Sequence, residues 1–115
     1  MNIDLGGHQG LKLWLQILTG VVKAKEANLT SRQFALLLRI YLKPHPHTVR
    51  GLASALNVSK PVITRAVDSL SLLGFVKRVR DEADKRNVHI QRTVKGAVFL
   101  TDFSERIEKA TEEIT

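Results

Sequence analysis

Residues 58–92 of the chain read VSKPVITRAVDSLSLLGFVKRVRDEADKRNVHIQR and predict a helix followed by a β-hairpin. Ser59 is a favourable N-cap residue, and Pro61 is tolerated in the first turn of a helix. Apolar residues then recur every three or four positions until Gly74, which suits the position after a helix C-terminus. Two short runs rich in β-branched residues follow, 75–80 and 88–93, and the polar loop between them predicts an exposed, charged hairpin tip.

Four further helices are predicted outside this stretch. A short helix capped by Thr48 ends at the tight turn 57–59, so two helices there are separated by only a few residues. The chain begins with an amphipathic helix over roughly 9–26, and a last helix covers about 94–114. Thr30 or Ser31 caps the remaining helix, which ends before Pro44 because proline cannot continue it. The apolar positions of that helix are predicted to be Phe34, Leu37, Leu38 and Tyr41.

This order of elements predicts a mainly α protein with a small two- or three-stranded β wing, that is, a winged helix-turn-helix. A chain of 115 residues suits one domain with one modest core. We expect residues 1–115 to form a single winged-helix domain with its central part at about 30–96. The flanking helices 9–26 and 94–115 are the expected dimer interface.

The charge of the chain points to a polyanionic partner. The chain has eighteen Lys and Arg residues and eleven Asp and Glu residues, which gives a net charge of +7. Residues 43–95 carry eleven basic and four acidic residues, whereas residues 102–115 are net acidic. Nucleic acid and an anionic membrane surface both fit such a charge. We find no signal peptide and no apolar run long enough to span a membrane, and cysteine is absent, so we expect a cytoplasmic protein without a membrane partner.

The predicted helix and hairpin fit DNA in particular, because an α-helix fits the major groove and can present side chains to base edges. Lys60, Thr64 and Arg65 share the helix face opposite the apolar residues. Asp68 lies on the same face, where it would repel phosphate, so we expect it to bond a neighbouring arginine or a backbone group. The hairpin is strongly basic and can lie along the DNA backbone or enter the neighbouring minor groove.

The motifs of this region resemble those of the MarR-type transcriptional regulators over about residues 29–100. The matching motifs are Val58–Leu70, Leu73-Gly74-Phe75-Val76, Arg80-Asp81-x-x-Asp84-x-Arg86 and Thr93-x-x-Gly96. The resemblance implies a recognition helix at about 59–73 in the major groove. It also implies that Arg86 enters the minor groove and that Asp84 orients it.

The sequence departs from the family pattern in two places. Arg92 stands where the family usually has an apolar residue. Family members also usually continue through another long helix that completes the dimer interface, so the resemblance implies a short member that lacks it. A small-molecule effector is compatible with the family, but nothing in the residues indicates one.

The candidate site residues fall into three groups. The expected DNA contacts are Ser59, Lys60, Pro61, Thr64, Arg65, Arg78, Arg80, Lys85 and Arg86. Asp81 and Asp84 are expected to orient the wing. The apolar seam of the last helix could pair with a second copy or fold back on the first helix, and we favour a homodimer. The interface residues would then be Trp14, Leu100, Phe103, Ile107, Ala110 and Ile114.

Other functions have less support in the residues. His45, His47 and His89 match no recognised metal-ligand spacing, so we expect neither a metal nor a cofactor. The chain has no phosphate-binding glycine loop and no nucleophile with a matching acid and base, so we expect no enzyme activity. Two alternatives remain open: a winged-helix module for protein interaction, and an accessory factor in DNA replication or chromosome organisation.

Overall fold

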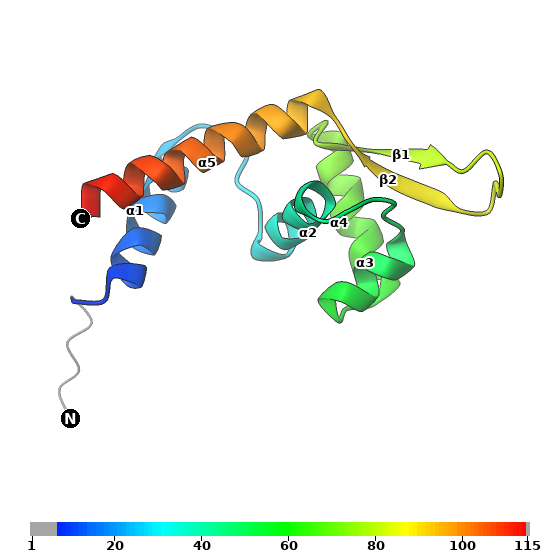
Figure 1. Ribbon diagram of the computed structural model, residues 1–115, viewed down its shortest axis with the longest axis horizontal. Helices are drawn as coiled ribbons and strands as arrows, with labels where there is room; N and C mark the ends of the chain where they lie inside the picture. The colour runs from blue at the N-terminus through cyan, green and yellow to red at the C-terminus, as the bar shows by residue number, and fades with distance from the viewer. Residues whose placement is uncertain (1–6, 115) are drawn as a thin grey trace. The chain divides into compact units, whose positions relative to one another are not determined.

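The computed structural model describes residues 7–114, which form five helices and one two-stranded antiparallel sheet (Figure 1). This confirms the mainly α fold with a β wing. The chain divides into two compact units. We call Leu29–Phe99 the central unit, and residues 7–28 together with 100–114 the flanking unit. The described residues contain no helix that is long and apolar enough to cross a membrane.

The first helix of the central unit, α2 (Ser31–Leu42), begins with a capping box. The Thr30 hydroxyl accepts a hydrogen bond from the Gln33 backbone N–H at 3.1 Å, and the Gln33 side chain accepts one from the Thr30 N–H at 2.9 Å. The helix stops at Leu42, as the prolines beyond it predict.

The predicted core face of α2 was partly wrong. Leu37 is fully buried as expected, but Leu36 and Ile40 share the core with it, and Leu38 is 40% exposed. Three consecutive leucines, 36–38, allow more than one apolar stripe, and packing against the other helices selects among them.

The helix-turn-helix consists of α3 (Val49–Leu56) and α4 (Lys60–Leu72). The Thr48 and Ser59 hydroxyls cap them, accepting hydrogen bonds from the N–H groups of Gly51 at 3.0 Å and Val62 at 3.4 Å. Asn57 turns the chain between the helices in the left-handed conformation, with φ of 54°. Gly74 ends the region at φ of 80°, where glycine is favoured. The local signals in the sequence therefore placed both helices correctly.

The wing is a hairpin of β1 (Val76–Arg80) and β2 (Val88–Arg92), with Arg78 opposite Ile90. Figure 1 shows α2, α3 and α4 grouped together and the hairpin projecting to one side of them. An isolated bridge pairs Thr48 with His89, and the Ile90 N–H donates to the His47 carbonyl at 2.8 Å. These contacts attach β2 to the segment that leads into α3. The sheet has two strands, so the three-stranded alternative did not form.

The base of the wing is held by Tyr41 and by the Thr93-x-x-Gly96 motif at the start of α5 (Val94–Ile114). The Tyr41 hydroxyl lies 2.7 Å from the Phe75 carbonyl, to which it donates, and accepts from the Thr93 N–H at 2.9 Å. A Cβ atom at Gly96 would lie 2.0 Å from the Tyr41 hydroxyl and 2.4 Å from the Phe75 carbonyl. Only glycine fits at position 96, which explains why the Thr93-x-x-Gly96 motif ends in glycine.

Arg92, which departs from the family pattern, has a structural role. Its Nε donates to the Ile40 carbonyl at 2.8 Å, and its Nη2 donates to the Lys43 carbonyl at 3.0 Å. The guanidinium also lies 5.9 Å from the centre of the Tyr41 ring. Arg92 thus satisfies carbonyl groups at the end of α2 that have no partner within the helix.

The flanking unit contains α1 (Gln9–Lys23) and most of α5. Ile17 of α1 and Ala110 of α5 are buried, and Arg106 forms an ion pair with Glu26. The helix α1 ends at Lys23, three residues earlier than predicted, because the backbone of Ala24 is extended. The apolar residues of α1 that remain exposed are Leu11, Trp14, Leu15, Leu18 and Val22.

Candidate nucleic-acid interface

The outer face of α4 carries the polar residues that the sequence predicted. Lys60, Thr64 and Arg65 are exposed, as are Ser59 and Pro61 at the start of the helix. The opposite face supplies four residues to the core: Ile63, Ala66, Val67 and Leu70. The core therefore fixes the rotation of α4, and its cationic side chains point away from the protein.

Arg78 and Asp68 link the wing to α4. The Arg78 Nη2 lies 2.5 Å from Asp68 Oδ1 and 3.5 Å from the Thr64 carbonyl. From the sequence, Asp68 was expected to bond a neighbouring arginine or a backbone group, and in the structure it bonds Arg78. Arg78 was itself predicted to contact DNA, but its guanidinium already has a carboxylate partner. Both side chains are partly exposed, at 37% for Arg78 and 57% for Asp68.

The wing tip is organised by its two aspartates. One oxygen of Asp81 accepts hydrogen bonds from the N–H groups of Ala83 at 2.8 Å and Asp84 at 3.4 Å. The other oxygen lies 3.4 Å from Nε2 of His89 on β2. Asp81 therefore braces the loop internally and also connects it to the strand that follows.

Asp84 holds Arg86 through a two-point contact. The Arg86 Nε lies 3.1 Å from Asp84 Oδ1, and Nη2 lies 3.3 Å from Oδ2. The side-chain hydrogen bond from Arg86, followed by the one from its backbone N–H, lowers the pKa of the Asp84 carboxyl from its ordinary value. The Arg86 side chain is still 90% exposed. The orienting role that the family resemblance implies for Asp84 stays a prediction.

Two other basic residues of the wing differ in their surroundings. Arg80 donates from Nη1 to the Lys85 carbonyl at 2.7 Å, so its guanidinium braces the loop. Lys85 is exposed. Of the wing residues predicted to contact DNA, Lys85 is exposed, and Arg86 is exposed while being held by Asp84. Arg78 and Arg80 also have partners within the protein, which are Asp68 and the Lys85 carbonyl.

An open hollow of about 440 Å³ lies between α3, α4 and the wing. Lys60 lines it from α4, and Arg86 and Asn87 line it from the wing. Arg50, which was not predicted as a site residue from the sequence, lines it from the first turn of α3. Its position in the first turn of the helix before the recognition helix is the signal that could have found it. The remaining lining residues are Thr48, Val49 and Val88.

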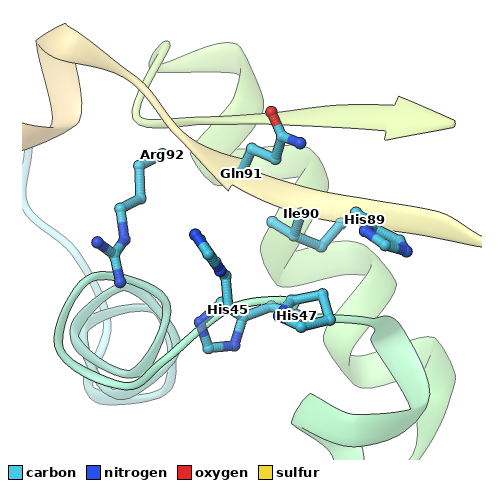
Figure 2. Close-up of a pocket in the computed structure, with 7 residues that line it drawn as sticks. His45, His47, His89, Ile90, Gln91 and Arg92 are labelled. Atoms are coloured by element: carbon cyan, nitrogen blue, oxygen red, sulfur yellow. The ribbon is translucent and has the colours of Figure 1, made fainter. Parts of the chain in front are cut away.

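A second hollow, of about 430 Å³, contains the three histidines considered in the sequence analysis (Figure 2). His45 and His47 lie on the segment before α3, and His89 lies on β2. The Nε2 of His47 is 3.2 Å from the Lys43 carbonyl, and His89 is paired with Asp81. Among residues 7–114, no group of three or more His, Asp or Glu side chains could hold a metal ion. His47 and His89 make local structural contacts.

The fold and the arrangement of α4 and the wing define a winged helix-turn-helix protein. The profile of the MarR family matches residues 27–87, and the chain belongs to this family. Over 76 residues it is 34% identical to the HTH-type transcriptional repressor YetL of Bacillus subtilis, covering 65% of this chain and 46% of YetL. It thus spans just under half the length of YetL.

Two further relatives extend the likeness to most of the chain. The uncharacterized HTH-type transcriptional regulator YpoP of Bacillus subtilis is 30% identical over 95 residues, which cover 83% of this chain and 67% of YpoP. The crystal structure of the transcriptional regulator Tm0710 from Thermotoga maritima superposes with a TM-score of 0.75 at 27% identity. That match covers 92% of this chain and 72% of Tm0710.

Proposed function

We propose that this protein binds double-stranded DNA at specific sequences and regulates transcription. The observation that carries the proposal is that Lys60 of α4 and Arg86 of the wing line the same hollow. Two cationic elements on one face can engage adjoining grooves of one duplex, α4 in the major groove and the wing in or beside the minor groove. The family membership and the transcriptional repressor YetL support the same function.

Sequence preference and affinity would come from different residues. Residues 59–65 at the start of α4 would reach base edges, since the N-terminal part of a recognition helix enters the groove. Lys85 and Arg86 in the wing would contribute charge, which supplies much of the affinity for DNA and carries little sequence information. The hollow and the exposed face of α4 belong to the central unit, so this unit is the proposed DNA-binding part of the domain.

The flanking unit is the proposed dimer interface. Trp14 is 54% exposed and Ile107 is 38% exposed, so both are available to a second copy. Ala110 is buried within the chain, and it therefore supports the packing of the flanking unit. Leu100, Phe103 and Ile114 are half-buried.

A symmetric dimer would read two half-sites about one helical turn apart, roughly 10–11 base pairs. The proposed place of action is the nucleoid in the cytoplasm.

Selection of DNA from a random-sequence duplex library tests the proposal. The wild-type protein is expected to enrich an inverted repeat, and a quantitative gel shift with the enriched duplex should show tighter binding than with a scrambled duplex. The variant K60A should alter the enriched sequence. Enrichment of no sequence, with equal binding to the scrambled duplex, would contradict sequence-specific regulation. The absence of any DNA binding would favour a protein-interaction module.

A further inference from the structure

If the proposed function holds, a strand of bound DNA would pass over the hollow between α3, α4 and the wing. A DNA duplex whose major groove takes α4 and whose adjoining minor groove takes the wing has one sugar–phosphate strand between those grooves. That strand must pass over the protein surface that lies between the two elements. The hollow of about 440 Å³ lies at that place, because Lys60 lines it from α4 and Arg86 lines it from the wing.

We propose that this hollow holds the DNA backbone between the two grooves, and that Arg50 is a further phosphate-binding residue. This inference rests on the proposed function and adds a residue and a contact to it. Three cationic side chains, Arg50, Lys60 and Arg86, come from three separate elements to line one hollow, and no acidic residue lines it. A backbone phosphate is the anion that such a surface would meet on duplex DNA.

Arg50 is free to make this contact. Its side chain is exposed, and among residues 7–114 no carboxylate lies within 4.0 Å of the charged groups of Arg50 or Lys60. Three arginines of the wing differ, since each has a partner within the protein. Arg86 is paired with Asp84, Arg78 is paired with Asp68, and Arg80 donates to the Lys85 carbonyl. Arg50 and Lys60 therefore keep their hydrogen-bond donors available to an external anion.

The position of Arg50 is not explained by the stability of α3. A cation in the first turn of a helix opposes the helix dipole, and Thr48 already caps this end through the Gly51 N–H. Alanine is also a better helix former than arginine. Replacing Arg50 by alanine should therefore leave the fold intact, so a loss of DNA affinity in that variant reports on binding.

The dependence of DNA affinity on salt tests the role of Arg50. For R50A we expect binding at least about tenfold weaker at low salt, with the slope of log affinity against log salt reduced by about 0.9 for each lost phosphate contact, which is about 1.8 for the proposed dimer with one contact per half-site. The loss should be the same on the enriched duplex and on a scrambled one, since a backbone contact carries no sequence information. R50K should retain most of the slope. K95A is the matched control, because Lys95 lies beside Gly74, beyond the opposite end of α4 from Lys60.

Neutral methylphosphonate linkages, placed one at a time along the enriched duplex, locate the contact. One position per half-site should weaken binding of the wild-type protein and leave binding of R50A unchanged. If R50A keeps the wild-type slope while K60A and R86A lose affinity, the inference about Arg50 is overturned and the proposed function stands. If the wild-type protein binds no duplex, the proposed function is overturned and this inference with it.

Discussion

The pairing of Arg78 with Asp68 predicts that Arg78 supports DNA binding without touching a phosphate. In R78A the Asp68 carboxylate would lose its partner while remaining on the outer face of α4. For a DNA phosphate about 8 Å from the Asp68 carboxylate, the repulsion between these two groups is about 0.5–2 kcal/mol, depending on the effective dielectric constant. That corresponds to binding weakened about two- to thirtyfold. Because both side chains are partly exposed, the loss of the pair should lower the free energy of unfolding by only about 0.2–1 kcal/mol.

A double-mutant cycle measured by fluorescence anisotropy separates this account from direct contact. We expect R78A to weaken binding most strongly at low salt, because salt screens the repulsion, and the double variant D68N/R78A to recover most of the affinity, because it removes the unpaired carboxylate. K95A controls for the loss of one positive charge. No recovery of affinity in the double variant would refute the reasoning and make Arg78 a phosphate contact.

Three further predictions concern the supports of the wing. G96A should lower the free energy of unfolding by about 3 kcal/mol or more, because the new Cβ would collide with Tyr41 and Phe75, and an unchanged thermal melting curve would contradict this. R92M should cost about 1 kcal/mol, because the Ile40 carbonyl loses its Arg92 partner while the Lys43 carbonyl keeps its contact with His47. The DNA salt slope of R92M should stay that of the wild type, and a changed slope would mean that Arg92 meets DNA. The depressed pKa of Asp84 means that its pairing with Arg86 is intact at neutral pH and is lost only as the pH falls through the lowered value. NMR titration should show the pKa of Asp84 rising toward its ordinary value in R86A, and identical midpoints in the two proteins would contradict the pairing.

The local features of the fold were predictable because each depends on a few neighbouring residues. The caps at Thr48 and Ser59 and the turn at Gly74 are hydrogen-bonding and backbone preferences that act over one helical turn. The core face of α2 was not predicted in full, since its leucines fit more than one stripe and only tertiary packing selects among them.

In the candidate site, too, the features set by neighbouring residues were predictable and those set by tertiary contacts were not. The exposed face of α4 follows from helical periodicity, and the relation between Asp84 and Arg86 follows from their closeness in the chain. The partners of Arg78 and Arg92 lie on other elements, so sequence alone could not assign these two arginines to structural roles. Arg50 was missed because the other two cations of the hollow, Lys60 and Arg86, are ten or more residues away in the chain.

The central claim is that α4 and the wing occupy adjoining grooves of one duplex. The chain contains no cysteine, so K60C and R86C each offer a single attachment site for a DNA-cleaving iron chelate. We predict that the K60C conjugate cuts across the major groove and the R86C conjugate across the next minor groove, with the cuts about half a helical turn apart, or roughly 5 base pairs. Cuts from both positions in the same groove of one half-site, or cuts within one half-site separated by more than a full turn, would contradict the account.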